Sequence, residues 1–211
     1  MGEPKWEAII LAGGEAKRLG GRDKAQLIGP DGRNCLETIV QGCASASKRV
    51  VVGPVRRGFS SVVWTQEEPP FSGPARGICA GMAMLADSQA SWVIVLACDM
   101  PHVGVGVVAL LDEASRLDAE GKTHVDGIVG ISEDGQHQWL CAVYRKESLA
   151  RACQRLPQGG TGESVRFLIG DLFLRELPML AETVEDIDTA DDMDTLGFSL
   201  RGYERDLVGL R

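Results

Sequence analysis

A short apolar run near the N-terminus stops at a pair of glycines, and this transition constrains the fold more than any other part of the sequence. Residues 8–11 are continuously apolar, which is typical of a strand buried on both faces of a sheet. Gly13 and Gly14 then remove the side chains, so that backbone amides can approach an anion. Four basic residues follow within the next eleven positions: Lys17, Arg18, Arg22 and Lys24. The combination predicts a phosphate-binding loop, which makes a nucleotide the first ligand to consider.

The better-known glycine-rich phosphate motifs do not fit this loop. No Gly-Lys-Ser/Thr triplet closes it, and the Gly-x-Gly-x-x-Gly spacing of dinucleotide-binding proteins is absent. A tight strand-to-helix turn with two surface cations is the alternative for a glycine pair taken alone. The second pair, Gly20 and Gly21, lets the chain turn back, and the full string over residues 11–24 is far more specific than such a turn.

The rest of the chain alternates between strand-like and helix-like segments. The predicted strands are 8–11, 49–52, 62–64, 92–97 and 127–131, and the predicted helices are 35–46, 77–86 and 107–117. Further along we predict a strand over 138–144, compatible with an antiparallel direction, a helix over 146–156, a last strand over 183–187, and a short helix over 190–196 with Thr189 as its N-cap. This order predicts a three-layer α/β fold, a mainly parallel, Rossmann-like sheet with helices on both faces.

Length and composition are typical of one enzyme domain. The 211 residues are 44% hydrophobic and 25% charged, and we expect a single domain over residues 1–198 followed by a charged tail over 199–211. The net charge of -8 argues against a nucleic-acid-binding protein, because such proteins usually carry a basic face. A local basic cluster in an acidic chain suits a small polyanion better than a polymer.

The cysteines and the apolar runs indicate the compartment. Six scattered cysteines form no Cys-x-x-Cys pair, which argues against a zinc site. No signal peptide opens the chain, and no run is long enough to span a membrane. We therefore expect a cytoplasmic protein with reduced thiols. Cys98 has no histidine at an obvious position to activate it as a nucleophile.

Asp99 follows the most apolar segment of the chain, residues 92–97. A carboxylate at the end of a buried strand is costly unless it is paired or holds a cation. Mg²⁺ suits this position because it takes one or two carboxylates together with phosphate oxygens and waters. The alternative is that Asp99 caps the next helix. Because ligands of parallel sheets bind at the carboxyl ends of the strands, Asp99 and the phosphate-binding loop should lie at the same edge.

Four motifs together resemble a known family. Leu-Ala-Gly-Gly-x-x-x-Arg-x-Gly-Gly-x-Asp-Lys over 11–24, Gly-Pro-x-x-Gly-Ile over 73–78, Cys-Asp-x-Pro over 98–101 and Asp-Thr-x-x-Asp over 188–192 are similar, in order and spacing, to the signature of the molybdenum cofactor guanylyltransferase type, the MobA-like family. The resemblance covers residues 8–196. It implies Mg²⁺-dependent transfer of GMP from GTP to the terminal phosphate of molybdenum-molybdopterin, with release of pyrophosphate. The implied partners are these substrates and, transiently, cofactor-insertion proteins or molybdoenzymes, with no nucleic acid or membrane.

The resemblance also implies a set of site residues. The catalytic residues would be Arg18, Lys24 and Asp99, and the metal ligands Asp99 and Asp188. The nucleotide would contact Leu11, Ala12, Gly13, Gly14, Lys24, Gly53, Gln66, Glu67, Glu68, Gly73 and Asp99. A carboxylate in this family contacts guanine. Glu67 and Glu68 are available here, whereas counting back from Gly73 places the family's aspartate nearer Gln66.

Several assignments stay open at this stage. Asp186 and Asp188 would share one side of an extended strand and could approach a metal, or they could be solvated charges before a helix. Pro54 and Arg56 stand with Gly53 where the family commonly has an asparagine, in the place of a base or ribose contact. Trp139, Tyr144 and Arg145 could line the pterin site or pack in the core.

Other activities also fit the sequence. A cytidylyltransferase for the same pterin, or a sugar or phospholactate nucleotidyltransferase, would share the strand, the loop and Asp99. From a different class, a non-catalytic nucleotide- or cofactor-binding protein could keep the same pocket. Turnover of GTP with Mg²⁺ would separate the enzyme from the binding protein.

Overall fold

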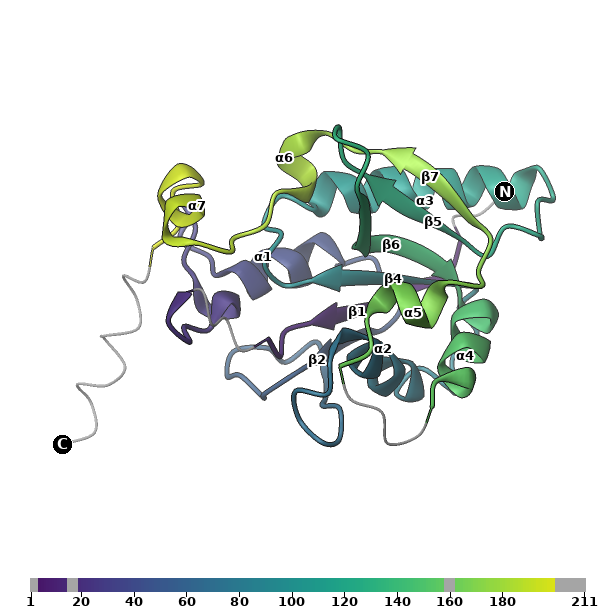
Figure 1. The fold of residues 1–211 in the computed structure, drawn as a ribbon, viewed down its shortest axis with the longest axis horizontal. Coiled ribbons are helices and arrows are strands. Elements are labelled where there is room, and N and C mark those ends of the chain that lie inside the picture. The colour runs from purple at the N-terminus through teal and green to yellow at the C-terminus, as the bar shows by residue number, and fades with distance from the viewer. Residues whose placement is uncertain (1–3, 15–18, 158–161, 200–211) are drawn as a thin grey trace.

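A computed structural model describes residues 4–14, 19–157 and 162–199. Its centre is a mixed sheet of seven strands in the order β3-β2-β1-β4-β6-β5-β7 (Figure 1). The strands are β1 (Trp6–Leu11), β2 (Arg49–Val52), β3 (Val63–Thr65), β4 (Trp92–Ala97), β5 (Gly127–Ile131), β6 (His137–Arg145) and β7 (Leu174–Pro178). Only β6 runs antiparallel to its neighbours β4 and β5; all other pairs are parallel. The predicted α/β fold with a mainly parallel sheet is confirmed.

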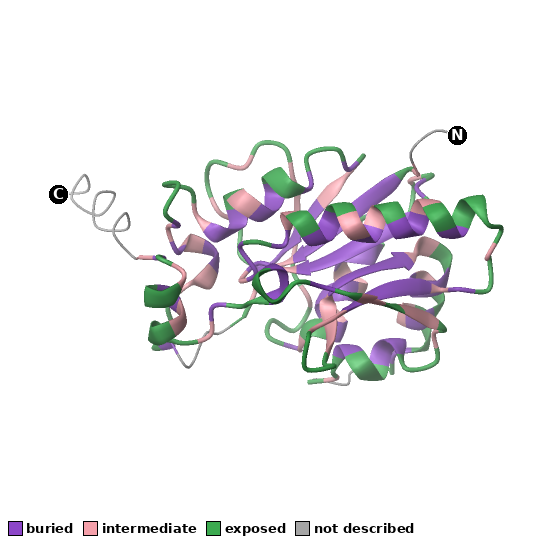
Figure 2. Cartoon of the chain, turned by 90° about the horizontal axis from the view of Figure 1, so that it is seen from above, coloured by how far each residue is buried: buried purple, intermediate pink, exposed green. Residues whose placement is uncertain are grey.

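Helices cover both faces of the sheet. They are α1 (Cys35–Gly42), α2 (Pro74–Ala83), α3 (Gly104–Ala119), α4 (Lys146–Arg155), α5 (Val165–Ile169), α6 (Ala181–Val184), α7 (Ala190–Thr195) and the short 3₁₀ helix η2 (Lys24–Gln26). Helices α1 and α3 pack on one face, with Ile10 of β1 in their core, and α2, α4 and α5 on the other, with Ile9. Successive strand residues point to opposite faces, so burial on both faces explains the continuous apolar runs (Figure 2). No described helix is long and apolar enough to cross a membrane.

The last part of the chain differs from the prediction. The predicted strand over 183–187 is wrong, because α6 ends at Val184 and the edge of the sheet beside β5 is taken by β7 instead. The segment after α6 passes the carboxyl end of β4, where the amide of Ile187 donates a hydrogen bond to the carbonyl of Asp99 (3.1 Å). Thr189 is the N-cap of α7, as predicted. Of the predicted tail, only Ser199 is described, and it forms a β-bridge with Ile28.

A buried ion pair lies at the opposite edge of the sheet from the Asp99 loop. The Glu7 side chain of β1 is fully buried, and the nearest cation is Nζ of Lys146, 3.2 Å from Oε2. Lys146 also donates hydrogen bonds to the carbonyl (2.9 Å) and hydroxyl (2.7 Å) of Ser88. Removal of one partner of such a pair leaves an uncompensated charge in the core.

We expect Lys146→Met to lower the free energy of unfolding by about 3 to 5 kcal/mol, because the Glu7 carboxyl group is then left buried without its cationic partner. Urea denaturation measures the change. Lys122→Met is the matched control, since Lys122 pairs at the surface with Glu120 and surface pairs contribute about 1 kcal/mol or less. Equal stability losses in the two variants would contradict the importance of the buried pair.

Candidate active site

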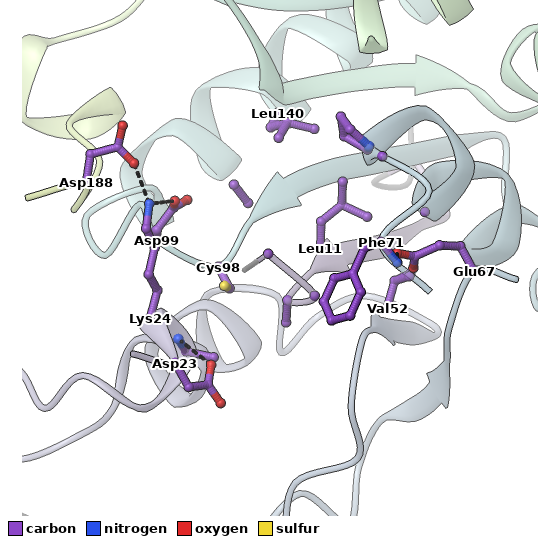
Figure 3. A pocket seen from close by; sticks show the side chains of 18 residues that line it. Leu11, Asp23, Lys24, Val52, Glu67, Phe71, Cys98, Asp99, Leu140 and Asp188 are labelled. Carbon is purple, nitrogen blue, oxygen red and sulfur yellow. Dashed lines mark hydrogen bonds and ion pairs between the residues drawn. The ribbon is translucent and has the colours of Figure 1, made fainter. Parts of the chain in front are cut away.

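A cavity of about 500 Å³ opens at the carboxyl ends of β1, β2 and β4 (Figure 3). Its described lining includes nine residues named from the sequence: Leu11, Ala12, Gly13, Gly14, Lys24, Glu67, Gly73, Asp99 and Asp188. The phosphate-binding loop and Asp99 therefore do meet at one edge of the sheet, as the parallel strand directions predict. The geometry brings these side chains together, and their individual roles stay predictions.

Other predicted contacts lie elsewhere. Gln66 and Glu68 are exposed, and with Gly53 they are not among the described lining residues of the cavity. Arg18, together with Lys17, lies outside the described residues. Arg56 is not among the described lining residues either; its guanidinium group pairs with the carboxylate of Asp23, which does line the cavity (2.8 Å).

Lys24 is held at the polar end of the cavity. Asp23, the N-cap of η2, accepts a hydrogen bond from the amide of Ala25 (3.1 Å) and so sets the turn on which Lys24 lies. Nζ of Lys24 donates to Oδ2 of Asp99 (2.8 Å) and to Oδ1 of Asp188 (Figure 3). Burial alone would lower the pKa of Lys24, but the two carboxylates outweigh it and raise the pKa above its ordinary 10.5. Lys24 is therefore fully charged at neutral pH.

Three carboxylates gather around this lysine. One oxygen from each of Asp99, Asp186 and Asp188 lies within 4.8 Å of the others. Burial, followed by repulsion from Asp188 and Asp99, raises the pKa of Asp186. The three carboxylates offer only oxygen ligands, and they repel one another. They already attract one cation, the ammonium group of Lys24, and such a cluster fits Mg²⁺. The three residues are thus suited to hold the ion that the family resemblance implies.

The segment between α6 and α7, residues 185–189, brings the carboxylates of Asp186 and Asp188 to that of Asp99. We call it the closing segment. Ile187 is fully buried between Asp186 and Asp188 and is hydrogen-bonded to the Asp99 backbone. The carboxylate of Asp192 then accepts hydrogen bonds from the amides of Asp188 (2.9 Å) and Thr189 (2.6 Å). The two aspartates therefore approach Asp99 from an irregular segment, not from the strand that the sequence suggested. In the sequence, the available signal was one apolar residue, Ile187, between two acids.

The other end of the cavity is apolar. Leu11, Val52, Phe71 and Leu140 line it, with Glu67 among them (Figure 3). Oε1 of Glu67 accepts a hydrogen bond from the amide of Phe71 (3.0 Å), which fixes the carboxylate at this end. Sequence reasoning missed Phe71, because a single aromatic residue in a proline-rich loop carries no periodic signal. A flat apolar slot with one carboxylate is suited to a heterocyclic base.

Cys98 lies next to Asp99 at the floor of the cavity. Its side chain is buried, and burial together with the Asp99 charge raises the pKa of its thiol. A neutral thiol is a poor nucleophile. The site therefore has no activated cysteine at this position, in agreement with the sequence.

The aromatic and basic residues of β6 separate into two groups. Tyr144 is fully buried in the core, and Arg145 stacks on Trp92 with its guanidinium carbon 4.4 Å from the ring centre. Because β6 is antiparallel, its end at Arg145 lies at the opposite edge from the cavity. Of the two alternatives left open by the sequence, core packing therefore holds for Tyr144, and neither residue is among the described lining residues of the cavity. Trp139 lies toward the cavity edge and stacks on His137 with ring centres 4.5 Å apart.

The comparisons with known proteins agree with this geometry. A family model described as the MobA-like NTP transferase domain matches residues 8–174. The chain belongs to the MobA-like NTP transferase family. The match contains the loop, Lys24, Glu67 and Asp99, and it ends before Asp186 and Asp188. Family membership therefore does not depend on the closing carboxylates.

Named relatives of this family are distant in sequence. A molybdenum cofactor guanylyltransferase of Vibrio parahaemolyticus is 28% identical over 159 residues, covering 72% of this chain and 74% of that protein. A probable molybdenum cofactor guanylyltransferase of Mycolicibacterium paratuberculosis is 31% identical, covering 76% and 79%. The crystal structure of molybdopterin-guanine dinucleotide biosynthesis protein A from Archaeoglobus fulgidus superimposes with a TM-score of 0.65 at 16% identity, covering 90% and 96%. The structural match shows a shared fold, and the sequence matches support a nucleotidyltransferase.

Proposed function

We propose that the protein is a Mg²⁺-dependent guanylyltransferase that transfers GMP from GTP to the terminal phosphate of molybdenum-molybdopterin and releases pyrophosphate. The observation that carries the proposal is one cavity with two unlike ends. Lys24, Asp99 and Asp188 line one end, with Asp186 beside them, and an apolar slot with Glu67 occupies the other. A nucleoside triphosphate is divided in the same way, because it has charged phosphates at one end and a heterocyclic base at the other.

The apolar end of the cavity, with the carboxylate of Glu67, supports guanine as the base of the nucleotide. A carboxylate accepts hydrogen bonds from both the ring N–H and the exocyclic amine of guanine, a pattern that adenine lacks. Oε1 of Glu67 already accepts one backbone hydrogen bond, and a carboxylate has capacity for several. The names of the distant relatives support the same base and the molybdopterin acceptor.

The reaction needs no protein nucleophile. An oxygen of the acceptor's terminal phosphate attacks the α phosphorus of GTP, and the bond from that phosphorus to the bridging oxygen of pyrophosphate breaks. Both reactants are anionic, so the protein contributes orientation and neutralisation. The amides of Gly13 and Gly14 and the ammonium group of Lys24 bind phosphate oxygens. Asp99 and Asp188, with Asp186 beside them, would hold Mg²⁺, which supplies further neutralisation of the triphosphate.

Calorimetric titration of GTP, CTP and ATP, each with and without Mg²⁺, tests the proposal. We expect the wild-type protein to prefer GTP and Mg²⁺ to strengthen its binding. Glu67→Gln should weaken GTP binding by about tenfold, because the amide cannot accept both guanine N–H groups. Glu147→Gln, exposed on α4, is the matched control. A preference for CTP would instead support a cytidylyltransferase, and binding without turnover of GTP and molybdopterin would support a non-catalytic protein.

A further inference from the structure

Arg56, in the segment after β2, is a nearly buried cation that makes four hydrogen bonds. Its side chain is only 7% exposed. Nε and Nη2 donate to the two carboxylate oxygens of Asp23 at 2.8 Å and 2.9 Å, and Nη2 also donates to the carbonyl of Ala12 at 2.8 Å. The fourth bond joins Nη1 to the carbonyl of Pro54 (3.1 Å). Paired bonds between guanidinium and carboxylate are strong and fix the relative orientation of their partners.

The two main partners of Arg56 are the two ends of the phosphate-binding loop. Ala12 comes directly before Gly13, where the loop leaves β1, and Asp23 comes directly before Lys24. Asp23 uses the same carboxylate to accept the amide of Ala25 (3.1 Å). A continuous set of contacts therefore leads from Arg56 through Asp23 to the turn that carries Lys24.

The backbone beside Arg56 is shaped for this contact. Gly53 has φ 144°, and a Cβ there would lie 2.6 Å from the Ala12 carbonyl oxygen and 2.9 Å from the Gly13 nitrogen. Only glycine allows the segment after β2 to lie this close to the start of the loop. The close approach brings Arg56 to the Ala12 carbonyl and the Asp23 carboxylate. Arg56 is not among the described lining residues of the cavity, where the sequence suggested a base or ribose contact.

We infer that Arg56 is a positioning residue that ties the end of β1 to the turn that carries Lys24, and so aligns the amides of Gly13 and Gly14 and the ammonium group of Lys24 with a triphosphate. The inference rests on the proposed function of the same cavity. Lysine cannot replace arginine here, because an ammonium group lacks the planar fork that reaches both Asp23 oxygens and Ala12. Arg56 acts through these partners and makes no contact with substrate.

A ligand series separates positioning from general support of the fold. Arg56→Lys should weaken binding of GTP by about tenfold or more, but binding of GMP by less than about twofold, because the loss depends on the phosphates beyond the first. Arg57→Lys, the exposed neighbouring residue, should change neither affinity. A purely structural role would weaken GTP and GMP equally. Asp23→Asn should reproduce the pattern from the other side of the pair, which provides a second variant if one of them folds poorly.

Hydrogen exchange of the free protein gives a readout without nucleotide. The amides of Ala25, Gln26 and Leu27, which are bonded within this turn, should exchange faster in Arg56→Lys, whereas those of α1 should not change. Nucleotide binding that is equal in wild type and Arg56→Lys would overturn this inference alone. A wild-type protein that binds no nucleotide would overturn the proposed function and this inference together.

Discussion

Replacement of Asp99 by asparagine is expected to lower turnover of GTP and molybdopterin by about 100- to 1000-fold. Asparagine keeps the shape of the side chain but removes the charge that binds Lys24 at 2.8 Å and one of the three carboxylates of the acidic cluster. Pyrophosphate release measures the rate. Mg²⁺ should also lose most of its effect on GTP affinity, because Asp99 is the carboxylate that β4 fixes in the cavity.

The fold should survive this substitution. The Asp99 carbonyl still accepts the amide of Ile187, so the closing segment keeps its backbone contact. Asp87→Asn, an exposed aspartate in the turn after α2, is the matched control and should have wild-type turnover. Turnover by Asp99→Asn within a factor of about three of wild type would rule out Asp99 as the metal ligand, because removal of such a group costs far more.

Replacement of Lys24 by alanine should have two effects of opposite sign. Affinity for GTP should fall by about 10- to 100-fold, because a charge-assisted bond to phosphate is lost. Affinity of the nucleotide-free protein for Mn²⁺, a spectroscopic substitute for Mg²⁺, should rise, since Lys24 no longer neutralises Asp99 and Asp188. Calorimetry measures the first effect and electron paramagnetic resonance of free Mn²⁺ the second.

The pH dependence of the wild-type protein offers an independent check. The pKa of Lys24 is raised, so its ammonium group keeps its charge below pH 10.5 and loses its proton only as the pH rises above that value. GTP binding should therefore not lose the contribution of Lys24 between pH 7 and 9.

The matched control for Lys24→Ala is Lys122→Ala, at the surface, which should alter neither GTP nor Mn²⁺ binding. A fall of both affinities in Lys24→Ala would contradict the competition between lysine and metal.

The sequence was most informative where strands are buried on both faces. Their apolar runs mark β1, β2 and β4, and the parallel direction of these strands brings Asp99 to the phosphate-binding loop. The glycine pairs and Lys24 could be recognised because a loop that binds phosphate has few alternatives to small residues and cations. These parts of the site depend on local chemistry, which a sequence displays directly.

Other parts depend on contacts that leave no local pattern. The strand β7 lies at the edge of the sheet, and its half-exposed residues lack the apolar run of a central strand. The pairing of Arg56 with Asp23 joins positions 33 residues apart, and neither residue type indicates its partner. The approach of Asp186 and Asp188 to Asp99 depends on the burial of Ile187, which only the packed structure reveals.

The order of the chain also has a consequence for synthesis on the ribosome. The last strand ends at Pro178, and the aspartates at 186 and 188 emerge after it. A nascent chain can therefore pair all seven strands and form the loop before the acidic cluster has its full charge. As the polypeptide grows, competence to hold a divalent cation should therefore follow the synthesis of the last strand of the sheet.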